Sequence, residues 1–200
     1  MDKSAPPQPT SQQSRKRAAI LDGARSVFLR DGLEAGTMDD VAAAAGVGKQ
    51  TLYRHFGSKE ALFVGLVERM CAEAASAAAP RDEHERRPVT DELRELGWLL
   101  VRHLTTQDNI RLFRAIVAAA GRHPELGRLF YGYGPKLARG MVAEILRRQF
   151  DQRVAETRAP TFVQLVLGDA YLEMTLGSEP PNAKARFKRQ IEEAIEAVLR

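Results

Sequence analysis

The sequence is poor in the residues that build disulfides and membrane spans. Cys71 is the only cysteine among 200 residues, so no intramolecular disulfide forms, and a reducing cytoplasm is the expected location. Cys71 is interpreted as a small buried apolar residue, with redox sensing as the alternative. No apolar run approaches the roughly 20 residues that span a bilayer, and no charged start followed by an apolar stretch indicates export. We therefore expect no membrane partner.

Signatures of catalysis are also missing. There is no glycine-rich phosphate loop and no Ser/His/Asp or Cys/His grouping in a recognisable nucleophile context. The four histidines are too scattered for a helical zinc pair: His55, His84, His103 and His123. Glu83 and Glu85 could ligate a metal together with His84, but the arginines around them favour a solvated loop. We expect no catalytic site, no metal site and no cofactor.

The composition that remains is that of an alanine-rich helical protein. Hydrophobic residues make up 44% of the chain, charged residues 28% and aromatic residues 6%. A chain of 200 residues can fold as one compact domain or as a small domain joined to a larger one. The formal charge of +4 is mild, and it fits a protein with one basic face better than one coated in cations. The predicted fold class is all-α.

The stretch 37–63 has the pattern of a helix-turn-helix. Thr37 followed three residues later by Asp40 resembles a capping box, which predicts the start of a short helix. Gly46 can take the left-handed conformation without steric cost, so it predicts the end of that helix and a tight turn. A second helix then begins near Lys49. In such a unit the second helix lies in the major groove of DNA.

The second helix of this unit presents mostly polar and basic side chains: Lys49, Gln50, Thr51, Tyr53, Arg54 and His55. No acidic residue occurs between Ala42 and Lys59, as a surface that faces phosphates requires, and protonation of His55 would add a positive charge. Ser58 is predicted to cap a third helix, whose first turn carries Lys59. One alternative is an amphipathic hairpin with a solvated polar face, and for Tyr53 alone the alternative is a packing role.

At this point a family resemblance becomes specific. The run AAAAGVGKQTLYRHFGSKEALF resembles the signature of the TetR/AcrR family of one-component bacterial transcriptional regulators, with its TLYxHFxSKExL core at residues 51–62. One departure is Gly48, where members usually carry a serine suited to capping the helix and touching phosphate. The resemblance covers about the first third of the chain. The middle section resembles, more loosely, the C-terminal domain of the AefR-like subgroup.

The N-terminal region contributes a further basic element. Residues 1–14 are polar and proline-rich and are predicted to form a disordered arm, followed by a first helix from Arg15 to about Arg30. The basic residues 15–17 either reach DNA or form a solvated helix start. The predicted DNA-binding domain is 15–60. Its predicted contact residues are Arg15, Arg17, Thr37, Lys49, Gln50, Thr51, Tyr53, Arg54, His55 and Lys59.

Residues 61–200 are predicted to form a helical ligand-binding and dimerisation domain. The helix opened by Ser58 continues to about Ala79 and spans about 30 Å, long enough to link two domains. Further helices are predicted from a cap at Thr90 to Leu104, from Ile110 to Ala120, from Lys136 to Phe150, from Pro160 to Leu176 and at the C-terminus. Within the helix at 110–120, Phe113, Ile116 and Val117 are expected to face inward.

The last two helices suggest self-association. The helix from Pro160 has almost no polar face, and the final helix carries a clear apolar stripe. Such a pair predicts a symmetric four-helix interface between two copies, with an intramolecular core as the alternative. The predicted interface residues are Phe162, Leu165, Val166, Phe187, Ile191, Ile195 and Val198.

The family resemblance implies how such a protein is controlled. In that family a small molecule enters a cavity among the central helices, shifts the linking helix and changes the separation of the two DNA-reading helices. Residues that could line this cavity, or alternatively be plain core, are Met70, Cys71, Trp98, His103, Phe113, Val117, Tyr131, Tyr133 and Met141. The resemblance therefore implies a ligand-released repressor that binds a palindromic operator as a homodimer. A DNA architectural protein without sequence preference is the competing hypothesis.

Overall fold

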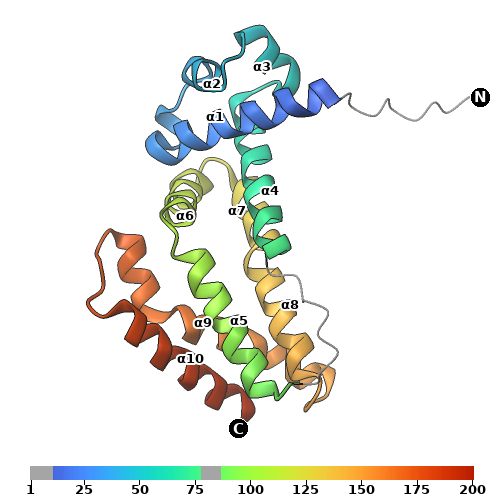
Figure 1. Cartoon of the computed structure of the whole chain (residues 1–200), viewed down its shortest axis with the longest axis vertical. Coiled ribbons are helices and arrows are strands. Elements are labelled where there is room, and N and C mark those ends of the chain that lie inside the picture. The colour runs from blue at the N-terminus through green and yellow to red at the C-terminus, as the bar shows by residue number, and fades with distance from the viewer. Residues whose placement is uncertain (1–10, 78–86) are drawn as a thin grey trace, which may run out of the picture. The chain divides into compact units, whose positions relative to one another are not determined.

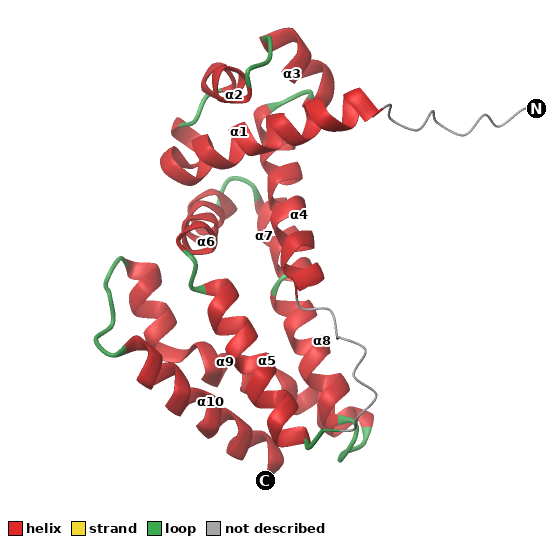
Figure 2. Cartoon of the chain, viewed as in Figure 1, coloured by secondary structure: helices red, strands yellow, loops and turns green. Residues whose placement is uncertain are grey.

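The computed structural model describes residues 11–77 and 87–200, and in these two ranges every regular element is a helix (Figures 1 and 2). The predicted all-α fold class is confirmed. The chain divides into two compact units, Met1–Val67 and Glu68–Arg200. This division falls inside helix α4 (Lys59–Ala77), somewhat later than the predicted boundary after residue 60. Across the described ranges, no helix combines the length and the apolar character that crossing a membrane requires.

The first unit contains α1 (Ser11–Ala35), α2 (Met38–Ala45), α3 (Lys49–Phe56) and the beginning of α4. Because α1 begins at Ser11, the prediction that a disordered arm extends to residue 14 was wrong for residues 11–14, while residues 1–10 lie outside the described part. The basic residues 15–17 are helical rather than part of a flexible arm. Helix α1 is interrupted at Gly32, two residues after the predicted end near Arg30, and then continues for one short turn.

Local side-chain and backbone caps set the bounds of α2 and α4. The Thr37 hydroxyl accepts a hydrogen bond from the Asp40 backbone N–H at 3.1 Å, which satisfies one of the free donors at the start of α2. Gly46 ends α2 in the left-handed conformation, with φ 63°. The Ser58 hydroxyl accepts from the Ala61 N–H at 3.1 Å at the start of α4. All three predicted caps are confirmed.

The core of the first unit is built on large apolar side chains from its four helices. Phe28 of α1 and Phe63 of α4 are fully buried, and their ring centroids lie 5.5 Å apart in an edge-to-face arrangement. Leu52 of α3 and Val41 of α2 are also fully buried. Because Leu52 is the one buried residue of α3, the remaining circumference of that helix is left for solvent or a partner.

The described residues of the second unit form the end of α4 and six further helices: α5 (Val89–Leu104), α6 (Gln107–Ala120), α7 (Pro124–Tyr133), α8 (Pro135–Leu146), α9 (Gln152–Leu176) and α10 (Ala183–Leu199). Its core is contributed mainly by α5, α8, α9 and α10. Leu93, Val142, Phe162 and Ile191 are fully buried there, one from each of these helices. Helices α9 and α10 therefore pack within a single chain.

Several predicted helix bounds in this unit were wrong. Thr90 does not cap α5, because the helix already begins at Val89 after Pro88. Helix α9 begins at Gln152, where the Asp151 carboxylate accepts from the Val154 N–H at 2.9 Å. Pro160 consequently lies inside α9 instead of in its first turn, and a break follows at Gly168. Helix α8 ends at Leu146 rather than at residue 150.

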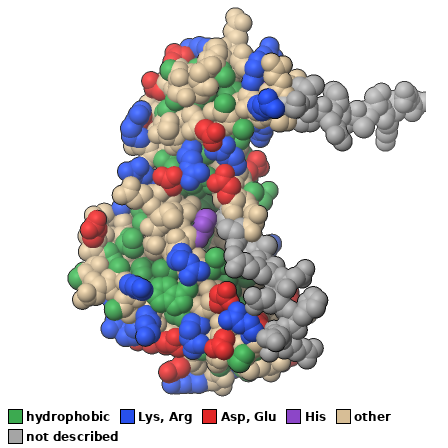
Figure 3. Space-filling model, viewed as in Figure 1, with side chains coloured by type: hydrophobic (Ala, Val, Ile, Leu, Met, Phe, Trp, Pro, Cys, Tyr) green, Lys and Arg blue, Asp and Glu red, His purple; other side chains and the backbone are tan. Residues whose placement is uncertain are grey.

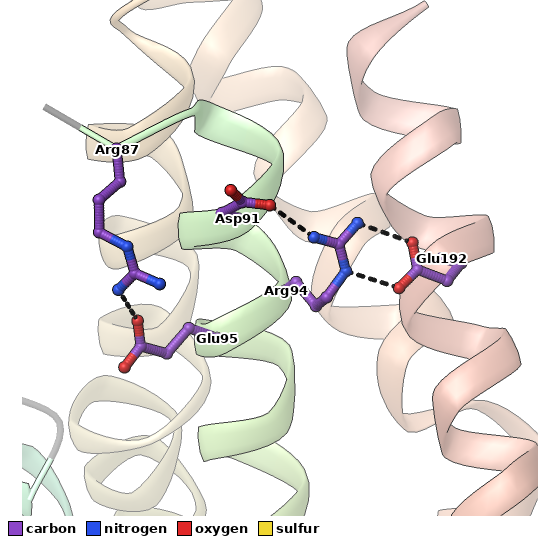
Figure 4. Close-up of polar contacts among 5 residues, drawn as sticks. All are labelled: Arg87, Asp91, Arg94, Glu95 and Glu192. Carbon is purple, nitrogen blue, oxygen red and sulfur yellow. Dashed lines mark hydrogen bonds and ion pairs between the residues drawn. The ribbon is translucent and has the colours of Figure 1, made fainter.

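Ion pairs fix the position of α5 on its neighbours (Figure 4). The Arg94 guanidinium donates to both carboxylate oxygens of Glu192 on α10, at 2.7 and 3.0 Å, and to Asp91 at 2.7 Å. The hydrogen bonds from Arg94 hold the pKa of Glu192 below its usual range. Arg87 pairs separately with Glu95. Exposed pairs each stabilise a fold only slightly, but a bidentate contact restricts how α5 and α10 align.

Candidate DNA-binding face and effector region

Helix α3 is held by one buried residue and exposes most of the others. Leu52 is fully buried, whereas Lys49, Gln50, Tyr53 and Arg54 are exposed, and Thr51 and His55 are half-buried. Tyr53 is 42% exposed, which argues against the alternative that it is a packing residue. The predicted contact residues of α3 are thus presented together on a short, firmly anchored helix, as reading of base edges requires.

The start of α3 carries an ion pair that the sequence reading missed. Gly48 precedes the helix in an extended conformation and provides no side-chain cap. The Lys49 ammonium lies 2.7 Å from a carboxylate oxygen of Asp39, in the first turn of α2. The hydrogen bond with Asp39 raises the pKa of Lys49. No local signal identifies this contact, because the two residues lie ten positions apart.

Lys59 and Thr37 also have intramolecular partners. The Lys59 ammonium donates to the backbone carbonyl of Glu34 at 3.0 Å, which ties the start of α4 to the end of α1. The Thr37 hydroxyl is engaged with Asp40, as the cap of α2. To bind DNA, each side chain must either keep its intramolecular hydrogen bond as well or break it. The DNA contacts of Lys59 and Thr37 therefore stay predictions.

The basic start of α1 lies next to the end of α3. The Arg17 guanidinium stands 4.6 Å from the centroid of the Phe56 ring, a cation–π contact that holds these two ends together. Arg15 is exposed. Positive charge from α1 is therefore added to that of α3 in the same unit.

His55 lies within this concentration of positive charge. Its pKa is lowered, first by burial and then by the charges of Arg54, Arg17 and Lys16. The imidazole is accordingly neutral at pH 7, and the cationic form considered from the sequence is corrected. The positive charges of Arg54, Arg17 and Lys16 thus act near this imidazole, as a surface that contacts phosphates requires.

We expect DNA binding to take up a proton at His55. A phosphate near the ring favours the imidazolium, so the pKa is higher in the complex than in the free protein and affinity rises as pH falls from 8 to 6, by about threefold to tenfold. The protein's own stability changes in the opposite sense, because a pKa lowered by folding makes acid destabilising. The measurement is the dissociation constant for DNA by fluorescence anisotropy across this range.

Two variants make this pH experiment decisive. His55→Gln should flatten the pH dependence, whereas His123→Gln, in the second unit, should keep it. An identical slope in the wild type and in His55→Gln would assign the proton uptake to another group.

The predicted cavity residues fall into three groups. Met70 and Cys71 are buried, and burial raises the pKa of the Cys71 thiol to about 11, which keeps it protonated and speaks against redox sensing. Half-buried positions are taken by Trp98, His103, Phe113 and Met141. Exposed positions are taken by Val117, Tyr131 and Tyr133. The structure therefore does not bring all nine together.

Val117 points away from the core, and the prediction that it faces inward was wrong. The buried face of α6 is formed by Leu112, Ala115, Ile116 and Ala119, and Val117 follows on the opposite side. Val117 is 59% exposed as a result. The prediction relied on residue type, but single apolar residues also occur on the exposed face of amphipathic helices.

Aromatic side chains from three helices meet beside Phe113. Its ring lies 5.7 Å from that of Phe130 on α7 and 6.0 Å from that of Tyr171 on α9. Phe130 and Tyr171 were not among the predicted ligand residues. Burial raises the pKa of Tyr171. Three aromatic rings from separate helices are a feature that an aromatic effector could exploit.

A polar group lies where α5 meets α6. The Asn109 amide donates to the backbone carbonyl of His103 at 2.7 Å and lies 3.4 Å from the His103 ring nitrogen Nε2. Burial lowers the pKa of His103. Asn109 was missed in the sequence reading, because its role depends on the turn that joins two helices.

The predicted dimer residues belong mainly to the core of the single chain. Six of the seven are buried within it: Phe162, Val166, Phe187, Ile191, Ile195 and Val198. Their assignment to an interface is corrected, since α9 and α10 use these apolar faces against each other and against α5 and α8. Leu165 is the one exposed member of the seven predicted residues. Two further leucines of α9, Leu172 and Leu176, are also exposed.

No cluster of three or more His, Cys, Asp or Glu side chains arranged for a metal ion occurs in the part of the chain that the structure describes. The alternative of a metal site at Glu83, His84 and Glu85 lies outside the described residues.

A helix-turn-helix with an exposed basic second helix, followed by a larger helical unit, defines the class of DNA-binding transcription regulators. Residues 20–66 match the family profile "Bacterial regulatory proteins, tetR family". Residues 91–200 match "AefR-like transcriptional repressor, C-terminal domain". The chain belongs to the TetR family of transcriptional regulators, which are not enzymes.

Three relatives illustrate the similarity. The HTH-type transcriptional repressor KstR2 of Rhodococcus jostii is 44% identical over 57 residues, 28% of each chain. The HTH-type transcriptional activator FasR of Mycolicibacterium smegmatis is 39% identical over 57 residues, 28% of this chain and 26% of FasR. The solved structure of the Flavonoid-responsive Regulator FrrA is 30% identical with a TM-score of 0.75, covering 93% of this chain and 96% of FrrA. The matches to KstR2 and FasR span under a third of those proteins.

Proposed function

We propose that this TetR-family regulator is a homodimer that represses transcription from a palindromic operator and is released by a small molecule. The observation that carries the proposal is α3, which exposes Lys49, Gln50, Tyr53 and Arg54 while one fully buried leucine anchors it. The chain divides into two compact units within α4. In this proposal the first unit reads DNA, and the second binds the effector and forms the dimer.

The proposed DNA contacts divide into two kinds. Lys49, Gln50 and Thr51 at the start of α3 read base edges in the major groove. Tyr53, Arg54 and His55, together with Arg15, Arg17 and Lys59, contact phosphates and set the position of α3. This division is supported by the charge around His55 and by the exposure of the first turn of α3. Replacing Gln50 should then change base preference, and replacing Arg54 should weaken binding to all sequences.

The proposed dimer surface is the exposed apolar face of α9. Leu165, Leu172 and Leu176 are all exposed on this helix. Hydrophobic side chains also gather on the surface where α5, α9 and α10 lie (Figure 3), and an open groove there is lined by Trp98 and by residues 182–185 and Lys188. A two-fold dimer places two copies of α3 at matching half-sites, which a palindromic operator requires.

The proposed effector region lies among the central helices of the second unit. Its support is the half-buried Phe113 on α6, whose ring lies beside those of Phe130 and Tyr171, together with the half-buried His103 on α5. FrrA is by name a flavonoid-responsive regulator, which supports responsiveness to a small molecule in this chain as well. The effector must bind the conformation that cannot bind DNA more tightly than the conformation that can. The ratio of these two affinities sets the largest factor by which the effector weakens DNA binding.

Selection of bound duplexes from a random pool by the purified protein tests the proposal. We expect a palindrome with half-sites about one helical turn or more apart. Salt-sensitive binding without any enriched sequence would favour an architectural protein instead. Reporter transcription from the recovered site, with and without the regulator, then decides the sign of control, since KstR2 is a repressor and FasR an activator.

A further inference from the structure

The strongest unassigned feature of the DNA-reading unit is the carboxylate of Asp39. Two acidic residues occupy the first turn of α2. Asp40 is used locally, because its backbone and side chain both engage the Thr37 hydroxyl. Asp39 has no part in that cap. Its two oxygens lie 2.7 and 3.0 Å from the Lys49 ammonium, across the turn on α3.

The position of this pair matters because Lys49 is the first residue of the DNA-reading helix. Both side chains are well exposed, 56% for Lys49 and 67% for Asp39, so DNA that approaches α3 meets them directly. The negative charge of Asp39 at this place repels DNA phosphates. It also pairs with the Lys49 ammonium, which would otherwise attract a phosphate. Gly48, the residue before Lys49, has no side-chain oxygen that could accept a hydrogen bond from the Lys49 ammonium in place of Asp39.

We propose that Asp39 is a specificity-determining residue, which withholds Lys49 from phosphates but leaves the ammonium able to donate to a correctly placed base. On a non-specific duplex, Lys49 gains a phosphate contact but loses Asp39, and Asp39 faces phosphate unpaired. On the operator, the ammonium keeps Asp39 and uses another of its three donors for a directed hydrogen bond to a purine acceptor in the major groove, so the ion pair is not lost. Asp39 therefore lowers non-specific affinity more than operator affinity. This inference rests on the proposed sequence-specific binding.

The test compares Asp39→Asn with the wild type, as full-length protein, on two duplexes of equal length: the selected operator and a scrambled version. Affinities are measured by fluorescence anisotropy at several salt concentrations. We expect scrambled-duplex affinity to rise about threefold to fivefold, as loss of one exposed ion pair allows. Its salt dependence should steepen by about one released counterion. Operator affinity should change less than twofold, so the specificity ratio falls.

Asp31→Asn is the matched control. It removes the same charge from the same unit, where Asp31 pairs with Arg30 on α1. Equal effects of both variants on both duplexes would show a general charge effect and overturn the proposal. A specificity ratio unchanged in Asp39→Asn would also overturn it.

A double-mutant cycle with Lys49→Ala isolates the pair. Without Lys49, Asp39→Asn should no longer change the ratio of operator to scrambled-duplex affinity, because direct repulsion of phosphate by Asp39 acts alike on both duplexes. A ratio that still falls would contradict the proposed route through Lys49. Failure of the proposed function is distinguishable from all these outcomes, because it appears in the wild type as equal affinity for operator and scrambled duplexes.

Discussion

Phe63→Ala is expected to unfold the DNA-reading unit and to abolish operator binding. Phe63 is fully buried, and its ring packs edge-to-face on Phe28 at 5.5 Å. Truncation of a buried phenylalanine costs about 3–5 kcal/mol of folding free energy. A unit of this size has little stability to spare, so the loss shifts it toward the unfolded state.

Amide hydrogen exchange measures this outcome residue by residue. In Phe63→Ala, protection should be lost in α1, α2 and α3 and retained in α8, α9 and α10, because the two groups belong to separate compact units. Phe63→Leu keeps most of the buried volume and should retain both protection and DNA binding. Native protection of α3 together with wild-type affinity in Phe63→Ala would show that this aromatic pair does not hold the unit together.

Leu172→Arg is expected to convert the proposed dimer into a monomer and to weaken operator binding by about 100-fold or more. Leu172 is 55% exposed, so a charged side chain there leaves the fold of the single chain intact. In the proposed interface it would bury an unpaired charge against the partner's apolar face. Loss of the second DNA reader removes the avidity that two linked half-site contacts provide, about 10²–10⁴.

Sedimentation velocity and anisotropy with the operator report the two effects separately. Leu137→Arg is the matched control, since Leu137 is also an exposed leucine, 40% accessible, but lies on α8. It should remain dimeric and bind normally. A Leu172→Arg protein that stays dimeric would place the interface elsewhere on the second unit.

The features that were predicted correctly are those with local causes. The caps at Thr37 and Ser58 and the turn at Gly46 involve residues at most three or four positions apart, so the spacing in the sequence already contains the contact. The same reasoning failed at Pro160. Proline suits the first turn of a helix, but Asp151 provides an earlier start and α9 tolerates the proline inside.

The features that were missed depend on which surfaces meet. An apolar stripe on α10 predicts burial, but it does not distinguish a neighbouring helix of the same chain from a second copy. Ile191 and Val198 are buried by their own chain for this reason. The partners of Lys49 and Lys59 are 10 and 25 residues away, and the pKa of His55 is lowered first by burial and then by charges that include Arg17 and Lys16 on α1. Only the folded arrangement supplies such information.

The setting of Cys71 makes the chain convenient for site-directed probes. The thiolate is the form that attacks maleimides and the methanethiosulfonate group of spin-label reagents. Because the sole native thiol is buried, with a pKa of about 11, it reacts poorly with them at neutral pH. A cysteine introduced at the exposed Ala44 on α2 would be labelled selectively, without first deleting the native one. Spin labels at this position in both copies of the proposed dimer would then measure the distance between the two DNA-reading units as candidate effectors are added.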